Sequence, residues 1–324
     1  MTGVSHPVWF ERPVPPEFAD EIGPRIEVSG PGTGSDPFFG IESAAGVIAS
    51  VLRYDGPVMD RASRALAIVR TGIGYDRVDV DAATKRGIAV CNTPNAPTVS
   101  TAEHTIALLL AVTKGVYSSA DRLRRGDNDL YTLHEAIELE GKTLGLVGFG
   151  RIARRVAAVA RSLGMHVVAF DPFLAQDAEA VTRIDDLDEL LNSADVVSVH
   201  VPLTGETKGL FDQKRFAAMK PGSFLINTSR GGVVDQDALV TALATGHLRG
   251  AALDVTDPEP LPADHPLLHR SDVVVTPHVA SATAEGKRRI LRSALAEVLA
   301  VLDGRQPEYL INPEVWPPQR RVAT

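Results

Sequence analysis

Short apolar runs alternate with amphipathic stretches through residues 143–279. The runs are almost continuously apolar, which is typical of parallel strands covered on both faces. The segments between them have helical character, and several begin at an aspartate that can cap free backbone N–H groups. We expect strands at 143–149, 166–170, 195–201, 223–229, 250–255 and 272–277, and helices at 151–164, 186–194, 212–219 and 235–246. This order predicts a doubly wound α/β fold.

The same rhythm recurs more weakly in the first 98 residues. Five β-rich runs lie at 6–10, 24–28, 44–50, 66–72 and 87–92, which predicts a second, smaller α/β domain. Two long helical segments, 98–116 and 282–304, flank the larger domain. We therefore expect the chain to cross between domains twice. The smaller domain would consist of residues 1–98 and 305–324, and the larger of residues 99–304 with the crossing helices.

Composition limits the functional classes. The chain has 324 residues, of which 44% are hydrophobic and 23% charged, and a net charge of −8. It therefore lacks the overall basic field that favours nucleic acids or anionic membranes. A single cysteine, Cys91, excludes internal disulfides and suits a reducing compartment. No apolar run reaches the roughly 20 residues of a membrane span, and the N-terminus lacks a signal-peptide pattern, so we expect a cytoplasmic protein.

A glycine-rich turn follows the first strand of the larger domain. Gly148 and Gly150, with Ala153 three residues later, match the G-x-G-x-x-G/A pattern of dinucleotide-binding turns. Alone, such a match is weak, because glycines at strand–helix turns also serve packing. Here it follows an expected strand and opens an expected helix, which is the context that the pattern requires.

An acidic residue completes this pattern. Asp171 ends the next strand, where a carboxylate can accept hydrogen bonds from the ribose hydroxyls of NAD and repel the 2′-phosphate of NADP. The pyrophosphate would lie on the backbone N–H groups of Arg151 and Ile152 at the helix N-terminus. The alternative is a packing turn followed by an ordinary strand-terminal aspartate. We favour NAD as the cofactor, bound by the larger of two Rossmann-like domains.

Three chemically active side chains follow three consecutive strands. Arg230 follows the fourth strand of the larger domain, Glu259 the fifth and His278 the sixth. The carboxyl ends of parallel strands share one edge, so these loops converge on the edge where a dinucleotide binds. Each residue taken singly could be a surface or turn residue. Their coincidence on successive strand ends beside a nucleotide turn favours a catalytic site.

The three residue types suit hydride transfer coupled to proton transfer. A histidine can supply the proton that a 2-oxo acid needs on reduction, since imidazole titrates near neutral pH. A carboxylate such as Glu259 beside His278 favours the imidazolium and orients the ring. The planar guanidinium of Arg230 can bind a substrate carboxylate and polarise the neighbouring carbonyl, while the glycines after it let the backbone approach the ligands.

Longer motifs extend this pattern through most of the chain. They are RTGIGYD at 70–76, GKTLGLVGFGRIA at 141–153, HVPLTGET at 200–207, INTSRGGVVD at 226–235, ALDVTDPEP at 252–260 and TPHVAS at 276–281. From about residue 45 onward the chain resembles the NAD-dependent D-isomer-specific 2-hydroxyacid dehydrogenases. The resemblance implies an oxidoreductase that interconverts a small D-2-hydroxy acid and its 2-oxo acid, and it implies a homodimer joined through the NAD-binding domain.

The resemblance also implies a role for individual residues. Arg230 would bind substrate, His278 would be the acid and base, and Glu259 would be its partner. Substrate would also meet the backbone N–H groups of Ile73 and Gly74. Besides the turn residues and Asp171, the implied cofactor-binding residues are Pro202, Thr207, Thr228, Asp254 and Ala280, with Asp254 on the nicotinamide carboxamide. No metal is implied.

Other features leave the substrate open. Phosphoglycerate dehydrogenases typically place Arg-Ser directly after the strand that reads GVIAS here, whereas this chain continues to Arg53. A different small anionic substrate, or an NADH-sensing corepressor on the same fold, is an alternative. His265 and His269 are four residues apart, as helical metal ligands can be, but Pro266 between them favours a surface loop. Glu103 and His104 are expected to stabilise the first crossing helix.

Overall fold

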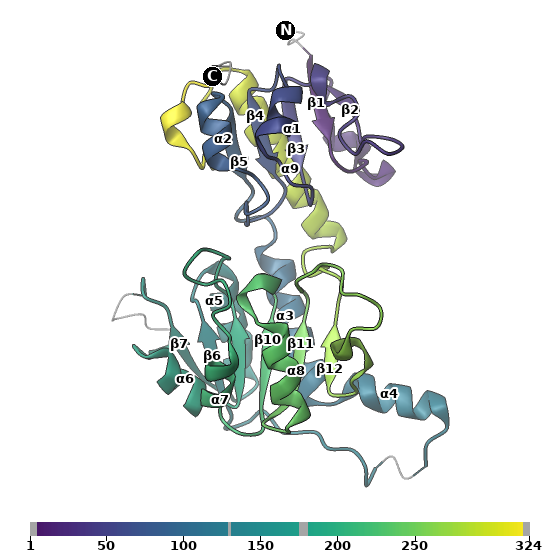
Figure 1. The fold of residues 1–324 in the computed structure, drawn as a ribbon, viewed down its shortest axis with the longest axis vertical. Coiled ribbons are helices and arrows are strands. Elements are labelled where there is room, and N and C mark those ends of the chain that lie inside the picture. Colours follow the sequence, from purple (N-terminus) through teal and green to yellow (C-terminus); the bar gives the residue numbers. More distant parts are fainter. Residues whose placement is uncertain (1–4, 129–130, 175–180, 320–324) are drawn as a thin grey trace. The chain divides into compact units, whose positions relative to one another are not determined.

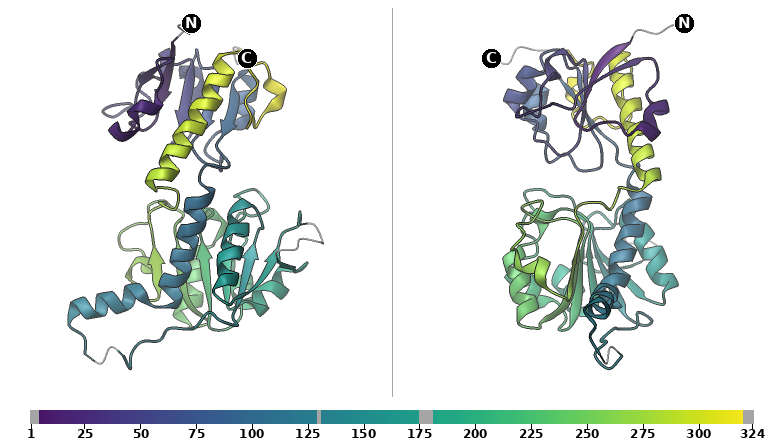
Figure 2. Two further views of the ribbon diagram at one scale, coloured as in Figure 1. Left: turned by 180° about the vertical axis from the view of Figure 1, so that it is seen from behind. Right: turned by 90° about the vertical axis from the view of Figure 1, so that its right-hand side faces the viewer.

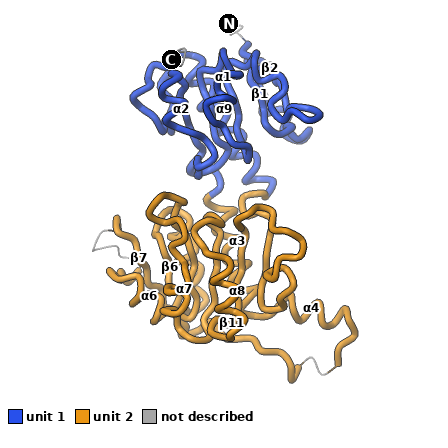
Figure 3. The backbone as a smooth tube through the Cα atoms, in the orientation of Figure 1, with its two compact units in different colours: residues 1–97, 283–324 blue, residues 98–282 orange. Residues whose placement is uncertain are grey.

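The chain forms two compact units, each built on one parallel β-sheet (Figures 1 and 3). The computed structural model describes residues 5–128, 131–174 and 181–319. Unit 1 comprises Met1–Pro97 and Thr283–Thr324, and unit 2 comprises Thr98–Ala282. The expectation of two doubly wound α/β sheets is confirmed.

Unit 2 holds a seven-stranded sheet in the order β12-β11-β10-β9-β6-β7-β8, and every pairing is parallel. Its strands are β6 Thr143–Val147, β7 His166–Phe170, β8 Thr182–Arg183, β9 Val196–Val199, β10 Ser223–Asn227, β11 Leu248–Leu253 and β12 Val273–Val275. Six correspond to expected runs; the two-residue β8 is too short to leave a hydrophobic pattern. The strand order reverses between β6 and β9, and ligands bind doubly wound sheets at such switch points.

Helices cover both faces of this sheet (Figures 1 and 2). They are α3 Thr98–Thr113, α4 Val116–Arg125, α5 Arg151–Ser162, α6 Leu187–Ser193, α7 Gln213–Ala218 and α8 Gln236–Ala244, with 3-10 turns η3 Gly231–Val233 and η4 Pro266–His269. Side chains of α3 and α5 pack with Leu146 and Val196, while those of α6, α7 and α8 pack with the next residues, Val147 and Val197. Both sides of each strand are therefore buried, which explains the continuous apolar runs.

The ends of these helices follow from local chemistry. Asp186, Asp212 and Asp235 each accept hydrogen bonds from backbone N–H groups in the first turn of α6, α7 and α8. The expected helix at 98–116 ends earlier, at Thr113. Gly115 takes a left-handed conformation with φ of 58°, which stops α3 and starts α4 in a new direction.

Unit 1 holds a five-stranded sheet in the order β2-β1-β3-β4-β5, again all parallel. Its strands are β1 His6–Phe10, β2 Ile26–Ser29, β3 Gly46–Ala49, β4 Ala67–Arg70 and β5 Ala89–Asn92. Its helices are α1 Gly56–Arg61, α2 Val80–Lys85 and α9 Ala284–Leu302, with 3-10 turns η1 Pro16–Glu21, η2 Ile41–Ser43 and η5 Pro313–Val315. The helices α1 and α2 pack on one face of the sheet and α9 on the other.

The second crossing helix, α9, belongs to unit 1. We expected residues up to 304 to form part of the larger domain, but the division falls at Thr283. The reason is packing: Val298 is fully buried against the sheet, and a side chain at Gly46 of β3 would lie 2.4 Å from its Cγ2. The tail after α9 also joins this sheet, since Asn312 Oδ1 accepts the Val90 N–H at 2.8 Å.

A helix that crosses a membrane must be long and apolar, and the helices of the described residues can be judged by this requirement. None of these helices combines the length and the apolar composition that crossing a bilayer needs.

Candidate active site

Three adjacent strands of unit 2 end at the predicted catalytic residues. In the sheet register Asn227 of β10 pairs with Leu253 of β11, which pairs with Val275 of β12. Arg230 lies three residues after Asn227, and His278 lies three residues after Val275. Because these two strand residues are aligned in the register, the two loops leave the sheet at the same level. The loop after β11, which lies between them, carries Glu259.

Glu259 and His278 are in direct contact. Glu259 Oε1 lies 2.7 Å from His278 Nδ1, and the two side chains are 30% and 33% exposed. An ionised carboxylate can only accept a hydrogen bond, so Nδ1 carries the proton of this bond. The other ring nitrogen, Nε2, is then the one that can exchange a proton with a ligand.

His278 occupies a strained backbone position. Its φ is 53°, in the left-handed region, and it is the one non-glycine residue with positive φ in the described ranges 5–128, 131–174 and 181–319. A residue with a side chain adopts this region only where its surroundings require it, and such strain concentrates at functional sites. The His278 N–H donates to the carbonyl oxygens of Asp254, at 2.7 Å, and Thr276, at 3.0 Å.

The carboxylate of Asp254 holds the rest of this turn. It is 1% exposed and accepts hydrogen bonds from the N–H groups of Val279 and Ala280, both at 2.9 Å, and from the Thr276 hydroxyl at 2.6 Å. Burial by itself raises the pKa of Asp254, but the hydrogen bonds from His104, Thr276 and these two N–H groups outweigh it and lower the pKa below its ordinary value. The group is therefore ionised at neutral pH.

His104 also belongs to this cluster, and sequence reasoning missed this position. We expected His104 only to stabilise its helix, α3. In the structure its Nε2 lies 3.0 Å from Thr276 Oγ1 and 3.4 Å from Asp254 Oδ1. Because the threonine hydroxyl donates to Asp254, it accepts from His104. Glu103 beside it is exposed, in keeping with a surface position on the helix.

The turn after β10 presents Arg230. Asn227 shapes this turn, because its Nδ2 donates to the Arg230 carbonyl at 2.9 Å and its Oδ1 accepts from both the N–H and the hydroxyl of Ser229. Arg230 is half-buried, and its Nη1 donates to the Ser229 carbonyl at 2.8 Å. Thr228 reaches α3, where its hydroxyl lies 2.9 Å from that of Thr105.

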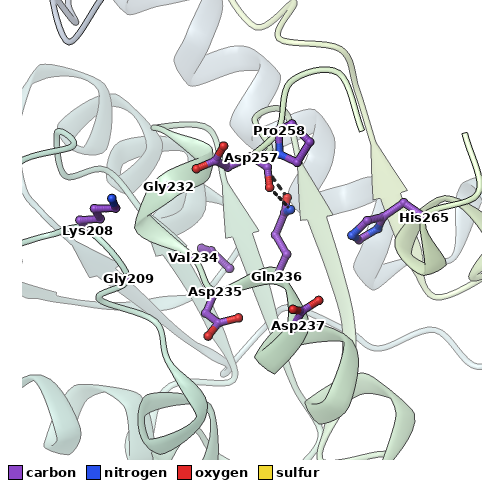
Figure 4. Close-up of a pocket in the computed structure, with 10 residues that line it drawn as sticks. All are labelled: Lys208, Gly209, Gly232, Val234, Asp235, Gln236, Asp237, Asp257, Pro258 and His265. Atoms are coloured by element: carbon purple, nitrogen blue, oxygen red, sulfur yellow. Dashed lines mark hydrogen bonds between the residues drawn. The ribbon is translucent and has the colours of Figure 1, made fainter. Parts of the chain in front are cut away.

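The backbone just after Arg230 packs on the loop that carries Glu259. A side chain at Gly231 would lie 2.1 Å from the carbonyl carbon and oxygen of Thr256, so the position tolerates only glycine. Beside this contact is a hollow of about 410 Å³, lined by Gly232, His265 and the segments 208–209, 234–237 and 257–258 (Figure 4). The contact joins the loop after β10, one residue beyond Arg230, to the loop after β11, three residues before Glu259.

The glycine-rich turn has the shape that a dinucleotide requires. Gly148 has φ of 89°, and a side chain there would come within about 3 Å of the His200 backbone at the end of β9. A Cβ atom at Gly150, which precedes α5, would have no neighbouring atom within 4 Å, so space is open in front of the helix. The N–H groups of Arg151 and Ile152 lie in the first turn, where a helix has no acceptors of its own.

Two titratable residues flank this turn. Asp171 follows β7, and its two carboxylate oxygens accept the N–H groups of Phe149, at 2.8 Å, and Phe173, at 2.9 Å. The carboxylate is thereby fixed next to the turn while each oxygen can still accept a further bond. Burial lowers the pKa of His200 to about 4, so this residue is neutral and adds no positive charge to the turn.

The remaining predicted residues fall in two groups. Thr207 lies in unit 2, in the turn after β9, where its hydroxyl donates to the Pro202 carbonyl at 2.5 Å. Ile73 and Gly74 lie in unit 1, in the loop after β4, and Arg53 is exposed in the loop after β3 of the same unit.

The two loop histidines bond locally. His265 Nδ1 accepts the Leu267 N–H at 3.3 Å, and His269 Nε2 lies 2.9 Å from the Ala263 carbonyl oxygen. Both therefore have local backbone partners, at Leu267 in the turn η4 and at Ala263 before it. Within the described residues, no three or more His, Cys, Asp or Glu side chains gather in a way that could hold a metal ion.

Comparison with known proteins identifies relatives. The sequence profile of the NAD-binding domain of D-isomer specific 2-hydroxyacid dehydrogenases matches residues 106–280. The chain is 43% identical over 270 residues to a glyoxylate reductase of Thermofilum pendens, covering 81% of this chain and 79% of that protein. It is 38% identical over 269 residues to a D-3-phosphoglycerate dehydrogenase of Methanocaldococcus jannaschii, covering 82% of this chain but only 51% of that protein. This chain thus spans about half the length of that relative.

A solved structure agrees over nearly the whole chain. The TT0316 protein of Thermus thermophilus superimposes with a TM-score of 0.86 at 42% identity, covering 94% of this chain and 99% of that one. The expected family resemblance, enzyme class and NAD-binding domain are confirmed.

The position of Asp171 predicts the choice of cofactor. We expect kcat/KM to favour NADH strongly over NADPH, because a 2′-phosphate would meet a fixed carboxylate. Asp171→Asn should reduce this preference about 10- to 100-fold, the range for losing charged hydrogen bonds. Steady-state kinetics with both cofactors measure it, with Asp185→Asn, at an exposed site of the same unit, as the control. Equal use of both cofactors by the unmodified protein would refute the role of Asp171.

Proposed function

The chain belongs to the D-isomer specific 2-hydroxyacid dehydrogenase family, and from this premise we propose that it transfers a hydride between NAD(H) and a small D-2-hydroxy acid or 2-oxo acid, with His278 as proton donor and acceptor. The reaction would take place in the cytoplasm, since the one cysteine of the sequence suits a reducing compartment.

The contact between His278 and Glu259 is the observation that carries this proposal. The 2.7 Å bond to Nδ1 orients the ring and leaves Nε2 as the nitrogen that can exchange a proton. The Nε2 proton is then available for the carbonyl oxygen of a 2-oxo acid on reduction. In the reverse direction the neutral ring accepts the hydroxyl proton from the 2-hydroxy acid.

Arg230 provides the binding group for the substrate carboxylate. A guanidinium can form two parallel charge-assisted bonds with a carboxylate, which fixes both position and orientation. The side chain is half-buried, and Asn227 holds the turn behind it by bonding the Arg230 carbonyl. Such support limits the motion of the cation and favours a defined substrate geometry.

The nucleotide turn and Asp171 suit the adenosine half of NAD. When bound, NAD(H) supplies or takes up the hydride. The N–H groups of Arg151 and Ile152 would bind the pyrophosphate, and Asp171 the ribose hydroxyls. We also propose Asp254, whose Oδ2 accepts the Ala280 N–H at 2.9 Å, as the acceptor for the nicotinamide carboxamide. Thr207, Thr228 and Pro202 remain proposed lining residues.

A loop of unit 1 offers a second group of donors for the substrate. Asn92 Nδ2 donates to the Ile73 carbonyl at 2.7 Å, and the Gly72 N–H donates to Thr93 Oγ1 at 2.7 Å. These bonds fix the loop after β4 from the neighbouring strand β5. We propose that the N–H groups of Ile73 and Gly74 bind the substrate carboxylate.

A substrate screen tests the proposed function. NADH consumption is measured with glyoxylate, hydroxypyruvate, pyruvate, bulkier 2-oxo acids and 3-phosphohydroxypyruvate, and at least one should be reduced. His278→Gln should lower kcat for that substrate by about 10²–10⁴, the range for losing a general acid, with NADH binding nearly unchanged. His269→Gln, which changes a loop histidine, is the matched control.

Two results would contradict this assignment. Full turnover by the His278→Gln variant, measured where chemistry limits the rate, would remove His278 as proton donor. Tight NADH binding without turnover of any 2-oxo acid would favour an NADH-sensing protein instead.

The proposed role of Arg230 predicts a kinetic pattern that differs from that of the His278 variant. Arg230→Lys should raise KM for every accepted 2-oxo acid and lower kcat, because an ammonium lacks the planar fork. The NADH dissociation constant and the melting temperature should change little, with Arg249→Lys as the control. Normal kinetics combined with a clear loss of stability would instead identify Arg230 as a structural residue.

We further propose that two copies associate through unit 2. Helix α4 has no buried residue, and it projects from the rest of the unit (Figure 1). Large apolar side chains are exposed on it and just after it: Val116 at 57%, Tyr117 at 56%, Leu123 at 67%, Tyr131 at 95% and Leu133 at 50%. Such a concentration of exposed apolar groups is characteristic of an interface.

A charge in this surface should disrupt the dimer. Leu123→Glu should convert the protein from dimer to monomer at micromolar concentration, because the carboxylate would have to be buried. Light scattering after gel filtration measures the mass. Val159→Glu, on the exposed side of α5 in the same unit, is the control and should remain dimeric. A monomeric unmodified protein would refute the proposed dimer.

A further inference from the structure

The first residue of α8 connects that helix to the loop that carries Glu259. Gln236 is 9% exposed, and its Oε1 accepts the Asp257 N–H at 3.1 Å. Its Nε2 donates to the carbonyl oxygen of the same residue. One side-chain amide thus satisfies both backbone polar groups of Asp257, as the pair of dashed lines in Figure 4 shows.

Asp257 lies two residues before Glu259, and the residue that precedes it is also held in place. The Thr256 hydroxyl donates to the Pro258 carbonyl at 2.9 Å, and the Thr256 backbone packs directly on Gly231. The partners of this loop, Gly231 and Gln236, both belong to the segment that follows Arg230. The segment after β10 therefore sets the position of the loop after β11.

Glu259 depends on this backbone for its position. Its side chain is 30% exposed, so the packing around it does not by itself define where its carboxylate lies. Its bond to His278 requires the carboxylate at 2.7 Å from Nδ1, and errors of about 1 Å in such contacts can cost about 100-fold in rate. A fixed peptide at Asp257 supplies the needed constraint.

We propose that Gln236 is a positioning residue of the hydride-transfer site: its amide fixes the Asp257 peptide and thereby holds the Glu259 carboxylate on Nδ1 of His278. The inference rests on the proposed function, because it gives Gln236 a role only through the Glu259–His278 pair. Gln236 itself does not touch substrate or cofactor in this scheme. It couples the loop that presents Arg230 to the loop that presents Glu259.

Two substitutions separate the contributions of the two hydrogen bonds between Gln236 and Asp257. Gln236→Met keeps the approximate size of the side chain and removes both hydrogen bonds. It should lower kcat about 10- to 100-fold, while the NADH dissociation constant stays within about twofold. Gln236→Glu keeps the acceptor for the Asp257 N–H but loses the donor to its carbonyl, so its kcat should be intermediate. Asp237→Asn, at the exposed next position of α8, should keep full activity.

A double-mutant cycle tests whether Gln236 acts through Glu259. In a Glu259→Gln background the carboxylate is already gone, so adding Gln236→Met should change kcat less than about threefold. Full additivity of the two losses would overturn the proposal, since Gln236 would then act independently of Glu259. Unchanged kcat in both Gln236 variants would also overturn it.

Controls keep this inference separate from the proposed function. Circular dichroism and melting temperature identify a variant that fails to fold. If Gln236→Met fails to fold, Gln236→Glu is compared with the unmodified protein instead. His278→Gln is measured in the same series. If the unmodified protein reduces no 2-oxo acid, or if His278→Gln keeps full activity, the proposed function fails; if those tests succeed and the cycle is additive, only the role of Gln236 fails.

Discussion

The buried carboxylate of Asp254 is the group around which the candidate site is arranged. It lies at the end of β11 and accepts hydrogen bonds from the backbone of the neighbouring β12 turn, at Val279 and Ala280, and from Thr276. A buried charge is costly unless several donors satisfy it, so these donors must gather around Asp254. The turn that results places His278 at φ of 53°, a conformation that an isolated chain would rarely populate.

Two kinds of contact tie the neighbouring segments to this site. The first is polar: His104, on α3, lies 3.4 Å from the buried carboxylate of Asp254, and side chains in a hydrogen-bonded network polarise each other. The second is backbone packing, because Gly231 contacts Thr256 and Gln236 holds the adjoining peptide. The loops after β10 and β11 therefore cannot move independently. Hydride and proton transfer require such preorganisation, since a small substrate offers few contacts with which to align itself.

The sequence by itself determined the main architecture and the candidate residues that follow its strands. Continuous apolar runs of this length, bounded by turn residues, are typical of strands buried on both faces, and polar residues placed directly after parallel strands emerge at one edge of the sheet. For that reason the order of residues alone predicted that Arg230, Glu259, His278 and Asp171 follow strands at that edge. Local signals of this type also predicted the aspartate caps of α6, α7 and α8.

Only the tertiary structure decided which distant segments support these residues. His104 and Gln236 lie on helices, and nothing in their local pattern reveals that their side chains meet Thr276 and Asp257, 172 and 21 positions away. The packing of α9 within unit 1 was likewise decided by tertiary structure, because this helix fills the surface beside Gly46. Hydrophobic periodicity specifies that a face is buried but not which face covers it, because that choice depends on shape complementarity between elements far apart in the chain.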